Sequence, residues 1–247
     1  MQEGRLCKSG LPWQEPRVII SPARRADCIY RGGFGMAERP AFFIRQGSVV
    51  TGSYTFEWFP GFAASQKQKS IESLHHAIME ADAGAKPLEI STRSREAVGR
   101  SLSAFRLKWK GRALENIFQS SKVFENGGPY LDLLDVPPRD AKRDERLRSS
   151  GALKAFRCRN ETFPLLPKTV FYDFLYIAAV KDSLAAEEIK EVSHYNYFTD
   201  IEFHPAKSIN TQARAAAIIK LMLEEYGRLP DFEKEDFIQY HKAHVTY

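Results

Sequence analysis

Residues 114–124 separate polar from apolar side chains by helical face. They read Leu114-Glu115-Asn116-Ile117-Phe118-Gln119-Ser120-Ser121-Lys122-Val123-Phe124. In a helix over about 113–124, Glu115, Gln119 and Lys122 occupy positions i, i+4 and i+7, so a carboxylate, an amide and an amine share one stripe. The same spacing also fits an exposed Glu and Lys on a solvated face, and the pattern by itself leaves both interpretations open.

The hydrophobic pattern on either side of this segment predicts a helix-rich chain. Before it, we expect strands over 41–44 and 49–59, an amphipathic helix from Ser65 to about Gly84, and short strands over 88–91 and 105–110. After it, we expect helices over about 138–148, 168–182, 184–194, 208–226 and 231–243. The prediction is a mainly α fold, a single helix-rich domain with a small β element near its N-terminus.

Residues 1–35 lack this order, because they show no sustained period of either 3.6 or 2. We expect them to be a disordered or mis-annotated N-terminal extension, and 36–247 to form the domain. Arg31-Gly32-Gly33 can be encoded by codons containing a ribosome-binding AGGAGG shortly before Met36. Translation from Met36 is therefore one hypothesis, and a real but flexible extension is the other.

Composition excludes several classes of protein. The 247 residues are 43% apolar, enough for a substantial core, yet no apolar run predicts a transmembrane helix or a secretory signal. Six cations and three anions lie in residues 1–35, so +3 of the net +5 falls there, which gives weak support for a general DNA-binding surface. The three cysteines (Cys7, Cys28 and Cys158) lack metal-type spacing, and we expect a cytoplasmic protein.

Four blocks of residues, in chain order, carry a family resemblance. They are Phe59-Pro60-Gly61-Phe62-Ala63-Ala64-Ser65, Glu115 to Lys122, Ala141-Lys142-Arg143 after Pro137-Pro138, and Asp200 with Ser208-Ile209-Asn210 and the helix Ala213 to Leu223. Together they resemble the NADAR (YbiA-like) family, named for its association with NAD and ADP-ribose, whose signature is Glu-x-x-Phe/Tyr-Gln-x-x-Lys. The resemblance covers about residues 54–226.

Two longer phrases narrow the resemblance to one branch. Residues 56–70 and Phe198-Thr199-Asp200-Ile201-Glu202-Phe203 look like the NADAR branch found beside DarT-type toxins, which attach ADP-ribose to guanine in DNA. The resemblance implies an ADP-ribosyl glycohydrolase, an N-glycosidase that acts as the antitoxin without a cofactor. The implied partners are ADP-ribosylated DNA, ADP-ribose as product and a DarT-type toxin. Asn116 departs from the His of many members, and 200–203 from a common Trp-Gly pair.

The reaction implied by this resemblance breaks the N-glycosidic bond between a base and ribose C1″. Glu115 would be the general acid and base, and Lys122, if desolvated enough to lose its proton, would be an imine-forming nucleophile. Gln119 would orient a ribose hydroxyl or the base, and Phe118 is the aromatic position of the signature. Lys122 and Glu115 are the expected catalytic residues, and Gln119 and Phe118 are expected to bind substrate.

The remaining blocks supply expected substrate contacts, each with a simpler structural alternative. Lys142 and Arg143 would bind phosphates, or they belong to a solvated run of mixed charge. Trp58, with Phe59 and Phe62, would stack on a base, or it belongs to the core. Gly61 and Ser65 match the aromatic-Gly-x-x-Ser segment. Asp200 and Asn210 would hold ribose hydroxyls, or they cap the last long helix.

Two other functions remain open at this point. One is an N-glycosidase of riboflavin-pathway intermediates, against which residues 58–70 argue, and the other is a non-catalytic module that binds ADP-ribose or a toxin. Metal binding is not expected, because His75 and His76 are adjacent on a helix and so face different directions.

Overall fold

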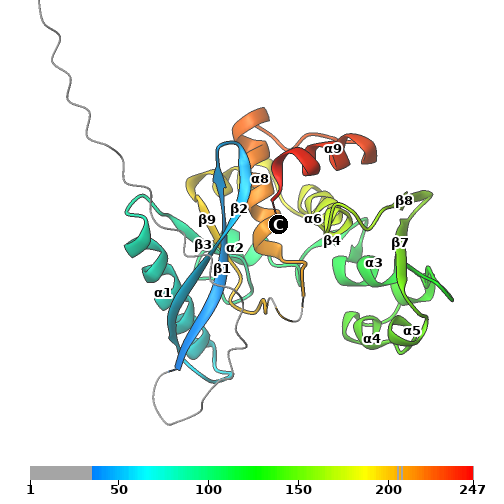
Figure 1. The fold of residues 1–247 in the computed structure, drawn as a ribbon, viewed down its shortest axis with the longest axis horizontal. Coiled ribbons are helices and arrows are strands. Elements are labelled where there is room, and N and C mark those ends of the chain that lie inside the picture. Colours follow the sequence, from blue (N-terminus) through cyan, green and yellow to red (C-terminus); the bar gives the residue numbers. More distant parts are fainter. Residues whose placement is uncertain (1–34, 205, 207, 247) are drawn as a thin grey trace, which may run out of the picture. The chain divides into compact units, whose positions relative to one another are not determined.

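A long hairpin begins the part of the chain that the computed structural model describes, which comprises residues 35–204, 206 and 208–246. Its strands are β1 (Gly35–Arg45) and β2 (Ser48–Trp58) (Figure 1). Their β-branched and aromatic side chains favour extended backbone. Gln46 and Gly47 between them take positive φ angles of 51° and 71°, as a two-residue hairpin turn requires.

Two short strands from distant parts of the chain complete this sheet. β9 (Tyr197–Thr199) pairs antiparallel with β1, and β3 (Pro87–Glu89) pairs parallel with β9, which makes the strand order β2-β1-β9-β3. Helix α1 (Ala64–Ala81) packs against the hairpin through its buried apolar face. Because Glu89 lies opposite Thr199, the sheet brings Glu89 beside Asp200, the residue that follows β9.

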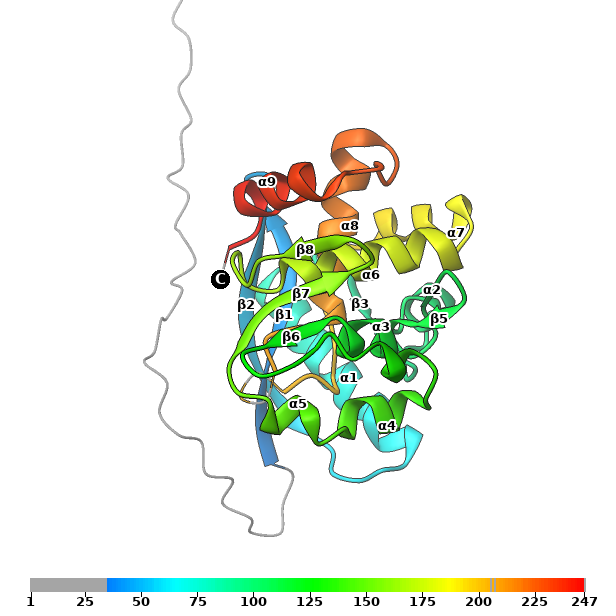
Figure 2. The same cartoon turned by 90° about the vertical axis from the view of Figure 1, so that its right-hand side faces the viewer.

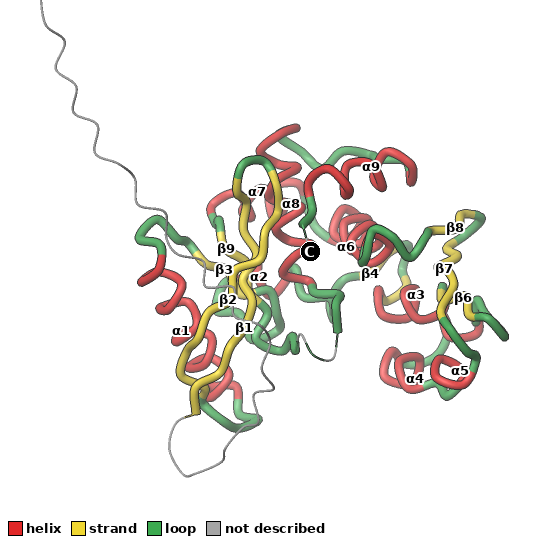
Figure 3. The backbone as a smooth tube through the Cα atoms, in the orientation of Figure 1, coloured by secondary structure: helices red, strands yellow, loops and turns green. Residues whose placement is uncertain are grey.

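A second group of strands forms two smaller sheets. β6 (Lys122–Phe124), β7 (Leu153–Cys158) and β8 (Glu161–Phe163) make an antiparallel sheet in that order. β4 (Lys108–Trp109) and β5 (Arg112–Ala113) make a two-stranded one. Figure 3 shows that these strands alternate with short helices.

Two central helices separate the hairpin from the small sheets, as Figures 1 and 2 show. They are α6 (Val170–Ser183) and α8 (Gln212–Tyr226), which pack against each other. All residues of α8 from Gln212 to Leu223 are buried, so this helix is covered on every side over three turns. Thr211 caps its N-terminus, and Gly227, with a φ of 67°, ends it in the left-handed conformation.

A buried ionic cluster ties the C-terminal helix α9 (Lys234–His244) to these central helices. Asp173 of α6 has no exposed side-chain surface and accepts hydrogen bonds from Thr169 (2.7 Å), from the ring of His241 in α9 (2.9 Å) and from Nε of Arg214 in α8 (3.4 Å). Burial alone would raise the pKa of Asp173, but the charge of Arg214 and these hydrogen bonds hold it below its ordinary value. We refer to these four residues as the Asp173 cluster.

The remaining helical elements are short. They are α2 (Ala97–Ser101), α3 (Leu114–Ser120), α4 (Pro138–Arg143), α5 (Arg146–Ser149), α7 (Ala186–Lys190) and the 3-10 turns η1 (Leu131–Leu134) and η2 (Glu191–His194).

The expectation of a mainly α fold is wrong, because the described residues mix helices with three sheets of four, three and two strands. The helix predicted over 113–124 is divided between α3 and β6, and that over 138–148 between α4 and α5. Strands β7 and β8 lie in a stretch for which no strand was predicted. The three-residue strands β6, β8 and β9 are too short to show a period, and β6 and β9 pair with strands that are distant in sequence.

The described residues belong to one compact unit, Gly33–Tyr247. Apart from Gly35, the expected N-terminal extension of residues 1–35 lies outside the part that the structure describes. No helix within the described ranges is long and apolar enough to cross a membrane.

Candidate active site

Helix α3 and strand β6 together carry the three residues of the polar stripe. Glu115 and Gln119 lie on α3, but Lys122 is the first residue of β6, so the expectation of one continuous helix through all three is wrong. Ser120 and Ser121 donate hydrogen bonds back to the carbonyl of Ile117 (3.1 and 2.7 Å) at the helix end. The carbonyl of Ser121 then accepts from the backbone N–H of Arg157 (2.7 Å), which draws the chain into the sheet with β7.

Glu115 and Gln119 form a direct pair one helical turn apart. Nε2 of Gln119 donates to Oε1 of Glu115 at 2.7 Å, which leaves the amide oxygen of Gln119 as a buried acceptor with no hydrogen-bond partner among the described residues. Gln119 is 6% exposed, whereas Glu115 is half-buried. A buried acceptor without a partner costs free energy. The pair therefore offers a fixed acceptor to a ligand that carries a hydroxyl or an N–H group.

Lys122 is the cation of this centre. Its ammonium lies over the ring of Phe118, with Nζ 5.1 Å from the ring centroid, and no carboxylate of the described residues lies within ion-pair distance of it. Burial lowers the pKa of Lys122 below the ordinary 10.5, the charge of Glu115 opposes this, and the charge of Lys142 lowers the pKa further. The charges of Glu115 and Lys122 therefore act on each other, as a single helix would also have allowed, although Glu115 lies on α3 and Lys122 on β6.

Asn116 brings Lys142 to this centre. Its amide Nδ2 donates to the carbonyls of Leu133 and Val136, both at 2.7 Å, and so holds the segment that leads into α4 against α3. Ala141 of α4 is fully buried, while Lys142 and Arg143 after it are exposed. The Asn that departs from the family pattern is therefore a structural clamp, and the charge of Lys142 lies within electrostatic reach of Lys122.

Phe118 lies beneath Lys122 and serves mainly as packing. It is 8% exposed, and its ring stacks on Phe156 (centroids 5.4 Å apart) and Phe171 (6.1 Å) and meets Tyr172 edge-on (5.4 Å). The aromatic position of the signature supports Lys122 from the core side.

Tyr172 of α6 connects this centre with the second half of the expected site. Its pKa is raised above the ordinary value by burial and then by the charges of Asp200, Asp173 and Glu115. The Tyr172 ring therefore lies within electrostatic reach of both Glu115 on α3 and Asp200 after β9. The sequence prediction missed Tyr172 because the apolar run 170–177 indicates core. The recurrence of Tyr172 and Tyr176 four residues apart in that run was the available signal.

Asp200 lies in a buried acidic pair with Glu89, a residue that the sequence analysis also missed. Asp200 is 8% and Glu89 2% exposed. The carboxylate of Glu89 accepts from Oγ1 of Thr199 (2.7 Å) and from the backbone N–H of Ile201 (2.9 Å), on either side of Asp200. Burial and the charge of Glu89 raise the pKa of Asp200 to about 8, although hydrogen bonds from Gln212 and from the backbone of Glu202 and Phe203 oppose the rise.

Asn210 and the early block lie at the periphery of this arrangement. Asn210 is half-buried, and its N–H donates to Oγ of Ser208 (3.2 Å), while Thr211 caps α8, so neither Asp200 nor Asn210 has that structural role. Trp58 lies between Arg39 and Lys67, Gly61 has a φ of 131° and Ser65 is exposed. Lys67 connects this block to the segment that follows β9, because its Nζ lies 3.4 Å from Oε1 of Glu202.

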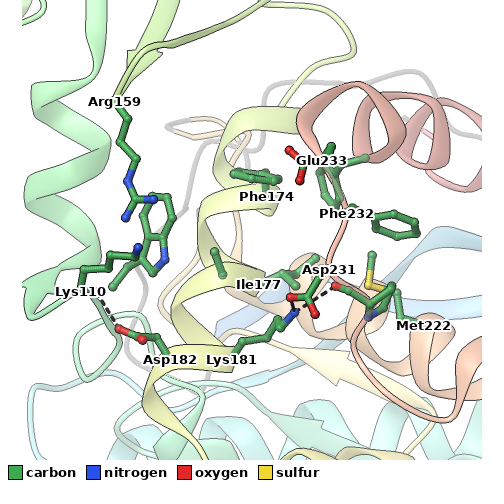
Figure 4. Close-up of a pocket in the computed structure, with 14 residues that line it drawn as sticks. Lys110, Arg159, Phe174, Ile177, Lys181, Asp182, Met222, Asp231, Phe232 and Glu233 are labelled. Carbon is green, nitrogen blue, oxygen red and sulfur yellow. Dashed lines mark hydrogen bonds and ion pairs between the residues drawn. The ribbon is translucent and has the colours of Figure 1, made fainter.

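A pocket of about 360 Å³ lies elsewhere, on the face of α6 that carries Phe174, Ile177 and Lys181 (Figure 4). Arg159 covers Trp109 on one wall, at 4.3 Å from the ring centroid, and Lys181 pairs with Asp231. None of the residues expected from the sequence lines it. The candidate centre therefore rests on the chemistry of its side chains and not on the depth of a cavity.

Comparison with known proteins identifies the family. A family model described as "DarT1-associated NADAR antitoxin" matches residues 37–246, which include every residue of the candidate centre. No curated protein sequence matches the chain. The match covers far more than half of the chain, so this protein belongs to the DarT1-associated NADAR antitoxin family.

Proposed function

We propose that this member of the DarT1-associated NADAR antitoxin family removes ADP-ribose from modified guanine in DNA by hydrolysing the N-glycosidic bond. The observation that carries the proposal is the placement of Lys122. Its amine is partly buried, lacks an ion-pair partner among the described residues and has a lowered pKa, all beside the carboxylate of Glu115. Such an amine is a better nucleophile at neutral pH than an exposed lysine.

The proposed reaction begins with Lys122 in its neutral form. The Nζ lone pair attacks C1″ of the ribose as the bond between C1″ and the base nitrogen breaks, and Glu115 donates a proton to the departing base. The new C1″–Nζ adduct loses a proton from nitrogen, and the ribose ring opens to an imine. Water then hydrolyses the imine, which releases ADP-ribose and regenerates the Lys122 amine. One water is consumed and no oxidant or reductant is needed.

The surrounding residues would bind the rest of the substrate. The free amide oxygen of Gln119 would accept from a ribose hydroxyl or from a base N–H. Lys142 and Arg143 would bind the pyrophosphate. Asp200, whose pKa is raised to about 8, would donate hydrogen bonds to ribose hydroxyls or accept hydrogen bonds from them. Tyr172, which the charges of both Glu115 and Asp200 affect, would lie along the ribose.

The test measures release of ADP-ribose from ADP-ribosylated DNA and, in parallel, turnover of free ribosylated pyrimidines. Wild type should release ADP-ribose from the DNA, and Lys122→Ala should not. Lys122→Arg keeps the charge but forms no imine, so it should also be inactive. Lys154→Ala, an exposed lysine on β7, is the matched control and should act as wild type does.

Three other outcomes would redirect the proposal. Turnover of the free pyrimidines alone would favour a small-molecule N-glycosidase. Absence of turnover with either substrate would leave a binding module. Absence of a borohydride-trapped adduct with active wild type would argue against the covalent step, and Glu115 would then activate water directly.

A further inference from the structure

The loop between β2 and α1 carries a phenylalanine that the fold leaves uncovered. Phe62 is 99% exposed, more than Phe105 at 81% and every other large apolar residue of the described chain. Gly61 before it has a φ of 131°, and a Cβ at that position would lie 3.2 Å from Cγ of Gln66. The loop thus folds back on the first turn of α1 and needs a glycine to do so. Its shape presents Phe62 to solvent.

Cations lie on the other aromatic rings of the same segment. Trp58 has the guanidinium of Arg39 at 5.2 Å and Nζ of Lys67 at 4.9 Å from its ring centroid, and Lys69 lies 5.8 Å from the centroid of Phe59. Aromatic rings that alternate with cations are the common means by which proteins hold single-stranded nucleic acid, because bases stack on the rings while phosphates meet the charges. We call Trp58, Phe59 and Phe62, with these three cations, the aromatic rim.

The aromatic rim is connected to the candidate active site. Nζ of Lys67 lies 3.4 Å from a carboxylate oxygen of Glu202, and the N–H of Glu202 donates to Oδ1 of Asp200 at 3.1 Å. Glu202 forms an ion pair with Lys67, whereas Lys69 has no carboxylate of the described residues within ion-pair distance and so keeps the rim attractive to phosphate. A strand whose modified base enters the site beside Asp200 would therefore continue onto the rim.

We propose that the aromatic rim holds the DNA strand adjacent to the modified guanine, and that the ring of Phe62 stacks on an unpaired neighbouring base. This inference rests on the proposed function, since it presumes a DNA substrate. It adds a stacking contact outside the reaction centre, because an exposed ring stacks on a base that has left its helical neighbours.

The experiment compares two substrates and three proteins. The substrates are a single-stranded oligonucleotide with one ADP-ribosylated guanine and the ADP-ribosylated guanine nucleoside alone. The proteins are wild type, Phe62→Ala and Phe105→Ala, the control being the next most exposed phenylalanine. Phe62→Ala should lower kcat/KM for the oligonucleotide roughly tenfold or more, as loss of one base stack does. It should leave the nucleoside unchanged, and Phe105→Ala should leave both unchanged.

Equal losses on both substrates, or no loss on the oligonucleotide, would overturn the inference while leaving the proposed function intact. Failure of wild type to hydrolyse either substrate would instead count against the proposed function. In that case, fluorescence anisotropy with unmodified single-stranded DNA still decides the inference. Weaker binding by Phe62→Ala than by Phe105→Ala supports the rim, and equal binding overturns it. Phe62→Trp, which keeps a stacking ring, should bind as wild type does.

Discussion

Two charged sites in this domain differ in whether the buried ion has a direct partner of opposite charge. In the Asp173 cluster the carboxylate is fully buried and contacts Arg214, His241 and Thr169, which come from two other helices and the turn before α6. In the candidate active site the Lys122 ammonium is partly buried, has no carboxylate of the described chain within ion-pair distance and lies near a second cation, Lys142. Both sites remove a charge from water, but only in the Asp173 cluster does the buried charge form a direct ion pair.

The difference separates a group that holds the fold together from a group available for chemistry. A compensated buried charge keeps its ordinary ionised form and is costly to lose, because its partners would remain buried without it. An uncompensated one moves its pKa toward the neutral form, which for an amine is the nucleophile. Burial is therefore a poor guide to function by itself, and the balance of charge around the buried group is a better one.

Lys122→Ala should give the largest change in activity and a small change in stability. We expect loss of at least about 10³-fold in kcat, the scale of removing an acid–base or nucleophilic group. Unfolding free energy should change by less than about 1 kcal/mol, since no ion pair of the described chain is broken. Product release and urea unfolding would measure the two effects. Destabilisation as large as that of a core substitution would contradict the distinction between Lys122 and the Asp173 cluster.

Asp173→Asn should show the reverse pattern, with the largest change in stability. Removing the charge leaves Arg214 buried without its carboxylate, and we expect a loss of about 3–5 kcal/mol in unfolding free energy. Because the pKa of Asp173 is lowered, the stabilisation is present above the ordinary value of 3.8 and is lost as pH falls through the folded pKa. Urea unfolding from pH 7 to pH 3 measures both.

The remaining activity of folded Asp173→Asn distinguishes the two sites. Under conditions in which the variant stays folded, it should hydrolyse substrate within about threefold of wild type, because Asp173 contacts no proposed substrate group. A loss comparable to that of Lys122→Ala would show that the two sites are coupled.

The pH dependence of activity in Lys142→Ala tests whether Lys142 lowers the pKa of Lys122. The charge of Lys142 lowers the pKa of Lys122, so its removal should raise that pKa. Activity requires the neutral amine and rises with pH through this pKa, and the rising limb should therefore move to higher pH. Pyrophosphate binding should weaken as well, so kcat rather than KM is the informative profile. If the rising limb of the kcat profile stays at the same pH, the charge of Lys142 does not act on Lys122.

Asp200→Asn should change stability by an amount that depends on pH. The folded pKa of Asp200 is raised from 3.8 to about 8, so the native state holds a proton that the unfolded chain loses, and wild type loses stability as pH rises between these values. Between pH 5 and pH 9 the variant should lose less stability than wild type, by up to about 1.4 kcal/mol for each pH unit between the two pKa values. Asp236→Asn, an exposed aspartate of α9, is the control. Equal pH slopes in wild type and Asp200→Asn would contradict the assignment.

Local pattern was sufficient for the long helices and for part of the site. The apolar spacing of α1 and α8 predicted both, and the i, i+4 relation of Glu115 and Gln119 is realised as a 2.7 Å hydrogen bond. The family resemblance is confirmed over residues 37–246. These features depend on neighbours within one or two helical turns, or on ordered blocks of residue types, and both can be read along the chain.

Only the tertiary structure placed Lys122, Tyr172 and Glu89. Lys122 belongs to a strand because its pairing partner is Phe156, more than thirty positions away, and no local period records that contact. Tyr172 and Glu89 lie in apolar segments and reach the site because α6 and β3 pack beside α3 and β9. By itself the sequence determined which groups are available for chemistry. Which of them meet, and which charge remains without a partner, depended on long-range packing, since burial and compensation are properties of the folded surroundings.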